Sequence, residues 1–108
     1  MSIGWIYLLI AGVFEVGFTT AMNFTGKGKW MGEAAFVVCI ILSFTFLQMA
    51  VKTIPIGIAY AVWTGIGAAG TLAVSTLVFK QPITGMQIVF VLILVGAVAG
   101  LKLTSAKA

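Results

Sequence analysis

Four long apolar runs, separated by short polar connections, fill most of the chain. Each run approaches the length of about 20 residues with which an α-helix crosses a hydrocarbon core. Since lipid offers no hydrogen-bonding partners, a spanning segment has to satisfy its own backbone groups, as a helix does. The pattern predicts an all-α integral membrane fold, with a single four-helix transmembrane domain over residues 1–108. The expected helices cover about residues 3–23, 30–51, 56–79 and 85–101.

The composition favours a membrane protein over a soluble domain. The mean hydropathy is +1.24, and only 7% of the residues are charged, whereas a soluble domain carries about 25%. All six lysines stand near the ends of apolar runs, where ammonium groups reach the lipid headgroups. The net charge of +4 is therefore no sign of nucleic-acid binding. The expected location is the inner (plasma) membrane.

The lysines give no clear signal for one orientation in the bilayer. Four spans place three lysines on each side of the membrane, so the positive-inside rule has nothing decisive to act on. We expect copies to insert both ways and to form an antiparallel dimer, unless one flanking lysine outweighs the others and fixes a single orientation. The two sets are Lys52, Lys102 and Lys107 on one side, and Lys27, Lys29 and Lys80 on the other.

Glu15 is the carboxylate placed deepest in an apolar run. A charged side chain at this depth costs a few kcal/mol, so it is rarely kept without a partner or a function. An ion pair with a lysine is disfavoured because every lysine lies near a membrane surface. The other acid, Glu33, stands near a helix start, where the helix dipole favours it. Glu15 is therefore predicted to bind protons and cations.

Several side chains are candidates to surround Glu15. Tyr60 and Trp63 share a face of the third span. Helical spacing places four residues on the face of Glu15: Ala11, Gly12, Phe18 and Thr19. Aromatic rings attract organic cations, especially where water is excluded. Two alternatives stay open: Tyr60 as an anchor at the membrane surface, and Ser43 as a hydroxyl bonded back to its own helix.

Glycines mark two further features. Gly65, Gly67 and Gly70 lower the helix stability of the third span, which makes this stretch the expected hinge. Gly96 and Gly100 form a ridge of small residues on the fourth span that would let two helices approach closely. This ridge is the expected dimer contact.

The sequence offers no chemistry for an enzyme. It has no histidine, no second deep acid and no nucleophile beside a base, so acid–base pairs and triads are absent. The lone Cys39 cannot form a cysteine metal cluster. We expect neither a cofactor nor a bound metal.

The chain resembles the small multidrug resistance (SMR) transporters over essentially its whole length. The run PIGIAYAVWTGIG at residues 55–67, with AGVFEV at 11–16 and GLK at 100–102, looks most like the guanidinium-exporter branch, often called Gdx or SugE. The resemblance implies an antiparallel dimer that exchanges protons for cations at a shared Glu15. It also implies that Ser43, Tyr60 and Trp63 position or surround that carboxylate.

Three alternatives to a guanidinium exporter remain. Phe18 stands where the exporters usually have tryptophan, and an aromatic wall without a donor would suit a broader exporter of quaternary ammonium compounds. Asn23, after Ala21 and Met22, resembles one subunit of the paired SMR systems, in which a paralogous chain replaces the second copy. A non-transport adaptor is the third.

In a transporter, a site that holds either a proton or a cation couples the two fluxes, and bending at the glycines would switch access between the two sides.

Overall fold

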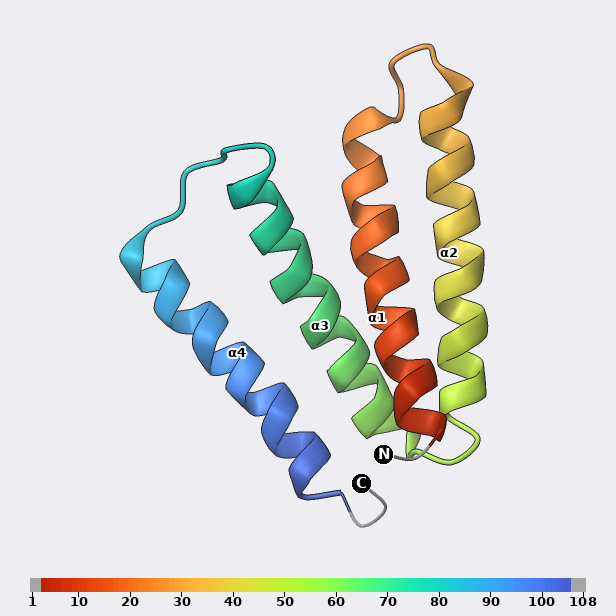
Figure 1. The fold of residues 1–108 in the computed structure, drawn as a ribbon, viewed down its shortest axis with the longest axis vertical. Helices are drawn as coiled ribbons and strands as arrows, with labels where there is room; N and C mark the ends of the chain where they lie inside the picture. Colours follow the sequence, from red (N-terminus) through yellow and green to blue (C-terminus); the bar gives the residue numbers. More distant parts are fainter. Residues whose placement is uncertain (1–2, 106–108) are drawn as a thin grey trace.

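Four helices that run alternately up and down make up the structure, a computed structural model that describes residues 3–105 (Figure 1). All four are long and apolar enough to cross a membrane, so the prediction of four membrane-spanning helices is confirmed. The Ile3 end of the first helix and the Leu103 end of the fourth lie at the same end of the molecule (Figure 1). The helices are α1 (Ile3–Ala21), α2 (Trp30–Ala50), α3 (Ile56–Leu77) and α4 (Gly85–Leu103).

Three helices end slightly earlier than the sequence suggested, and α4 ends later. After α1 the chain forms a short 3₁₀ turn, η1 (Met22–Phe24). At the end of α3, Lys80 adopts a left-handed backbone with φ of 55°, and the Gln81 N–H donates to the Ser75 carbonyl at 3.0 Å. The left-handed residue ends the helix, and the bond gives the Ser75 carbonyl a donor. Lys107, which entered the lysine balance, lies outside the described residues.

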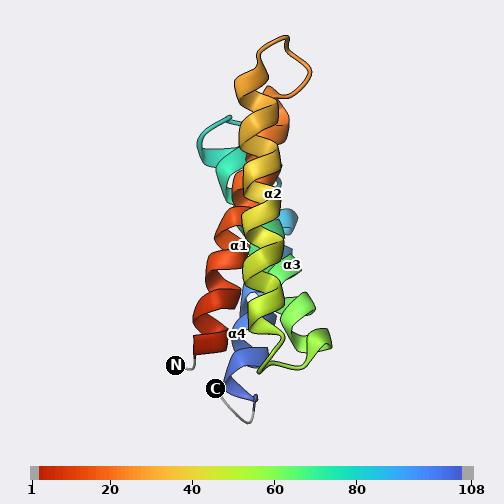
Figure 2. The same ribbon diagram turned by 90° about the vertical axis from the view of Figure 1, so that its right-hand side faces the viewer.

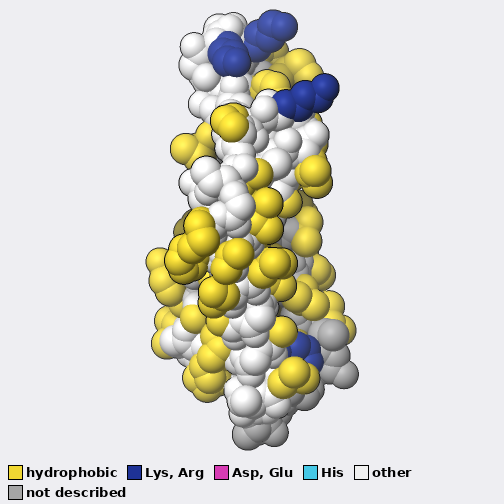
Figure 3. All heavy atoms as spheres, turned by 90° about the vertical axis from the view of Figure 1, so that its left-hand side faces the viewer, with side chains coloured by type: hydrophobic (Ala, Val, Ile, Leu, Met, Phe, Trp, Pro, Cys, Tyr) yellow, Lys and Arg dark blue, Asp and Glu magenta, His cyan; other side chains and the backbone are white. Residues whose placement is uncertain are grey.

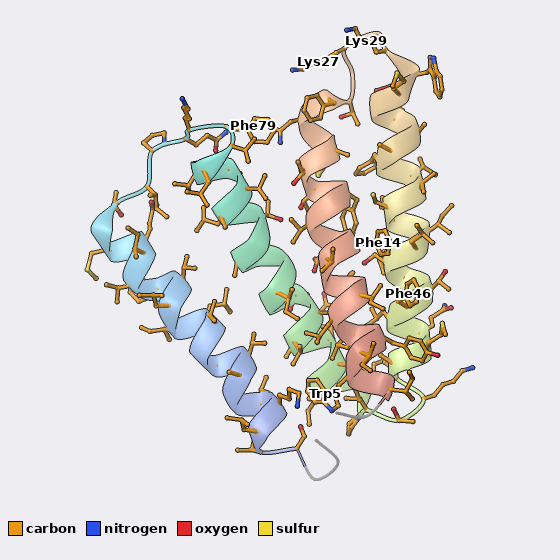
Figure 4. All side chains as sticks on the ribbon, in the orientation of Figure 1. Trp5, Phe14, Lys27, Lys29, Phe46 and Phe79 are labelled. Atoms are coloured by element: carbon orange, nitrogen blue, oxygen red, sulfur yellow. The ribbon has the colours of Figure 1, made fainter. Side chains whose placement is uncertain are left out.

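The turn between α1 and α2 is held by glycines and an acid. Gly26 and Gly28 have φ of 73° and 77°, a conformation that only glycine adopts without strain. Glu33, in the first turn of α2, accepts a hydrogen bond from the Gly26 N–H at 2.7 Å. Lys27 and Lys29 lie at this end of the molecule (Figure 4). Glu33 thus fixes an exposed turn, far from the centre of the span.

Helix α1 lies between α2 and α3 and packs against both (Figures 1 and 2). The core is concentrated where α1, α2 and α3 converge, near Trp5 (Figure 4). Because Gly65 has no side chain, Val98 of α4 packs directly onto its backbone. The buried side chains of this core are Trp5, Leu8, Ala11, Ala50, Ile54, Ala59, Val62 and Trp63.

Helix α4 stands at the edge of the bundle. Among the described helices, its backbone lies close only to that of α3, and none of its residues is buried. Its Lys102 ammonium reaches back over the Trp5 ring at 5.5 Å from the centroid. Apolar side chains cover the face of the molecule on the α4 side, with lysines toward the two ends (Figure 3). A single chain therefore leaves one long apolar helix available to lipid or to another helix.

Candidate functional site

Glu15 lies on α1 directly against the backbone of α3. The α3 residue beneath its carboxylate is Gly67, which is buried. A Cβ built at Gly67 would collide with the Glu15 carboxylate. The site therefore depends on glycine at this position, because the missing side chain leaves the room in which the carboxylate lies.

The Glu15 side chain borders a cavity of about 570 Å³ between α1 and α3, which is open to the surface of the molecule. One carboxylate oxygen, Oε1, is buried and has no hydrogen-bond partner within residues 3–105. An unpaired buried oxygen costs about 1–3 kcal/mol unless a proton or a ligand supplies a donor. The cavity lining is Glu15, Thr19, Thr64, Gly67, Ala68, Thr71, Leu72 and Ser75.

Hydroxyl groups form much of the polar lining, and of these only Thr19 was expected from its place on the Glu15 face of the first span. Thr64, Thr71 and Ser75 face the cavity together with Thr19 of α1. The hydroxyls of Thr19 and Thr71 are hydrogen-bonded across the gap between the helices. The available signal was the spacing of i, i+7 and i+11 on α3, which places these residues on the same helix face as Gly67.

Ser43 and Trp63 link three helices in the core. The Trp63 indole Nε1–H donates to Ser43 Oγ at 3.0 Å, and Ser43 Oγ donates to the Ala11 carbonyl of α1 at 2.7 Å. Both side chains are buried. The serine bonds across to α1 and not back to its own helix. Since Ala11 precedes Glu15 by one helical turn, the link fixes the segment of α1 that carries the carboxylate.

Like Ser43 and Trp63, three other predicted pocket residues do not line the Glu15 cavity. The Phe18 ring packs edge-on against Phe36 of α2, with the centroids 6.1 Å apart. Tyr60 is 58% exposed, and its ring lies beside that of Trp63 with the centroids 5.7 Å apart. Gly12 is buried under Ile66 of α3, where a Cβ would come within 2.6 Å of Ile66 Cγ2. In one chain, Phe18 thus gives the Glu15 cavity no aromatic wall.

Two of the predicted hinge glycines, Gly67 and Gly70, act here as contact points for α1 within an uninterrupted helix. Gly70 lies against Val16 of α1, as Gly67 lies against Glu15. The close approach of α1 explains these glycines without a kink. Gly96 and Gly100 of α4 differ, because no atom in the described part of the chain would come within 4 Å of a Cβ there. Their surface is free for a second helix.

Replacing Ser43 with alanine should lower the free energy of unfolding by about 2 kcal/mol, because the change leaves the buried Trp63 N–H without its acceptor. Reversible unfolding in mixed detergent micelles would measure the loss. The control is Thr45→Ala, which removes an exposed hydroxyl bonded to the Ile41 carbonyl of its own helix at 2.7 Å. That variant should change stability by less than about 0.5 kcal/mol. Equal effects would contradict the structural role of the Ser43–Trp63 link.

The fold and the site together define a multi-pass membrane protein with a half-buried acid beside a cavity between two helices. The chain belongs to the Small Multidrug Resistance family, whose family model, described as "Small Multidrug Resistance protein", matches residues 3–94. The resemblance seen in the sequence is therefore confirmed.

Relatives in this family carry transport names. A Bacillus licheniformis protein named "Probable guanidinium efflux system subunit GdnD" is 39% identical over 104 residues, which cover 94% of this chain and 98% of the relative. Proteins named "Guanidinium exporter" from Escherichia coli and Salmonella typhimurium are 34% and 33% identical over 102 residues, covering 94% of this chain and 97% of each relative. The family and these names are those of transporters and not of enzymes.

Proposed function

We propose that this chain exports guanidinium or substituted guanidinium ions across the plasma membrane in exchange for protons. The observation that carries the proposal is Glu15 Oε1, a buried carboxylate oxygen without a donor at the edge of a cavity. The names of the relatives support guanidinium as the cation. Glu15 is the proton- and substrate-binding residue of this account.

The chemistry of guanidinium suits a carboxylate. The planar ion presents two parallel N–H donors to two carboxylate oxygens, a geometry that a spherical ammonium lacks. A proton and a guanidinium ion compete for the same oxygens, so cation binding requires proton release. Transport of one species in one direction is thereby tied to transport of the other in the opposite direction.

The proposal includes an antiparallel homodimer with alternating access. Two features of the chain favour a partner: α4 buries none of its residues, and Gly96 and Gly100 leave its surface open. A second copy packed there would follow the small-residue rule for membrane helices. Flexing of α3 at Gly65, Gly67 and Gly70 would change the separation of α1 and α3 and open the cavity to either side.

A second candidate function is that of one subunit in a transporter of two different chains. The Bacillus licheniformis relative is named as a subunit of an efflux system, which favours this alternative. In that case the open face of α4 would receive a paralogous chain, and the purified chain alone would be inactive.

The test is transport by the purified chain alone in liposomes that contain a pH-sensitive dye. An outward guanidinium gradient should drive protons inward, while a tetrapropylammonium gradient should drive far fewer. Guanidinium-driven proton flux would support the homodimeric exporter. Equal flux with both cations would favour a broad quaternary ammonium exporter. No proton flux with either cation would contradict transport by this chain alone. Flux restored by adding a paralogous chain would then favour the two-chain system.

A further inference from the structure

Hydroxyl groups form part of the lining of the Glu15 cavity. Four of its lining residues carry hydroxyl groups: Thr19, Thr64, Thr71 and Ser75. Two are tied to backbone carbonyls of their own helices. The Thr64 hydroxyl lies 2.9 Å from the Tyr60 carbonyl, and the Thr19 hydroxyl lies 2.9 Å from the Glu15 carbonyl.

These bonds decide what the hydroxyls can offer to a ligand. A threonine hydroxyl has one proton and two lone pairs. Thr64 donates its proton to the helix backbone, so its remaining capacity is to accept. Thr19 does the same, and Thr71 therefore acts as the donor in the bond between Thr19 and Thr71. The Thr71 oxygen also keeps its lone pairs, so the cavity presents acceptors beside the Glu15 carboxylate.

We infer that Thr64 and Thr71, which lie on either side of Gly67 along α3, contribute to the specificity of the site as separate acceptors for N–H groups that the Glu15 carboxylate leaves unpaired. This inference rests on the proposed function and goes beyond it. A guanidinium ion carries N–H donors on all three nitrogens and no acceptor. The carboxylate engages two of these donors, and the others lose water on entering the cavity. Hydroxyl acceptors on α3 replace that water.

The same lining disfavours cations without N–H groups. A quaternary ammonium ion can neutralise the carboxylate but can satisfy none of the hydroxyl oxygens. Sites built to hydrogen-bond a substrate reject an analogue that lacks the group, because their own polar atoms are left unpaired. The hydroxyls of α3 therefore select for cations that donate several hydrogen bonds.

The test compares Thr64→Val and Thr71→Val with the wild type in the liposome assay. Valine keeps the shape of threonine and removes the acceptor. The KM for guanidinium should rise about tenfold in each variant, the loss expected for a hydrogen bond to a charged group. The apparent affinity for tetramethylammonium, measured as a substrate or as an inhibitor of guanidinium flux, should stay constant or improve.

Two further variants separate a specificity role from a structural one. Thr45→Val removes a hydroxyl that is bonded back to α2 and lies outside the cavity, so its KM should match the wild type. Thr64→Ser restores the acceptor and should recover most of the guanidinium affinity. Parallel weakening of both cations, or no recovery with serine, would overturn the inference while leaving the proposed function intact. A wild-type chain that moves no cation would overturn both.

Discussion

Replacing Glu15 with glutamine should reduce cation-driven proton flux in liposomes to the level of protein-free vesicles. Glutamine has almost the same shape as glutamate, but it neither releases a proton nor carries the charge that attracts a cation. Losing the charged partner of a buried pair costs about 2–5 kcal/mol, which corresponds to a loss in affinity of about thirtyfold to several thousandfold. The measurement is the initial rate of internal pH change after a guanidinium gradient is applied.

The matched control is Glu33→Gln. Glu33 is exposed and holds the first turn through the Gly26 N–H, so its loss should leave most of the flux intact. Comparing the proton flux of the two variants shows whether transport needs the acid at position 15 in particular or any acid in the chain. Proton-coupled guanidinium transport by the Glu15→Gln variant would contradict the proposed mechanism.

Replacing Gly67 with alanine should weaken guanidinium binding by about tenfold or more. Helix propensity alone would favour this replacement, since alanine stabilises a helix interior by about 1 kcal/mol relative to glycine. A Cβ at this position, however, would collide with the Glu15 carboxylate. Forcing extra volume into such a contact costs about 1–3 kcal/mol. The carboxylate would have to leave its position, and equilibrium binding of guanidinium to the purified protein would measure the effect.

Gly57→Ala is the control for this experiment. Gly57 lies in the first turn of the same helix, and no atom of the described residues comes within 4 Å of a Cβ built there. Guanidinium binding should be unchanged in this variant. Wild-type affinity in the Gly67→Ala variant would show that the Glu15 carboxylate does not need the space that the glycine leaves.

The sequence predicted the four helices because the length of an apolar run is fixed by the thickness of the bilayer. It did not predict which helices of the chain pack together, because lipid and protein neighbours are both apolar and the hydrophobic pattern does not tell them apart. Glu15 and Phe18 illustrate this point. They are three residues apart, about 60° around the helix, yet Glu15 faces α3 while Phe18 packs on Phe36 of α2.

The surroundings of Glu15 were only partly predictable for the same reason. The sequence grouped Ser43, Tyr60 and Trp63 by resemblance, but Ser43 and Trp63 bond to each other and to α1, and Tyr60 is largely exposed. Their roles in substrate binding remain predictions. The threonines of α3 were missed because a hydroxyl in a membrane helix usually bonds to its own backbone. Thr64 does so, and it still lines the cavity.

The central claim is that one carboxyl group holds either a proton or a cation, and counting protons tests it most directly. Guanidinium is added to the purified protein in weakly buffered detergent solution, and the protons released per cation bound are measured for the wild type and for Glu15→Gln. The account predicts proton release on binding to the wild type, and neither binding nor release in the variant. Guanidinium binding without proton release, or equal release by both proteins, would contradict it.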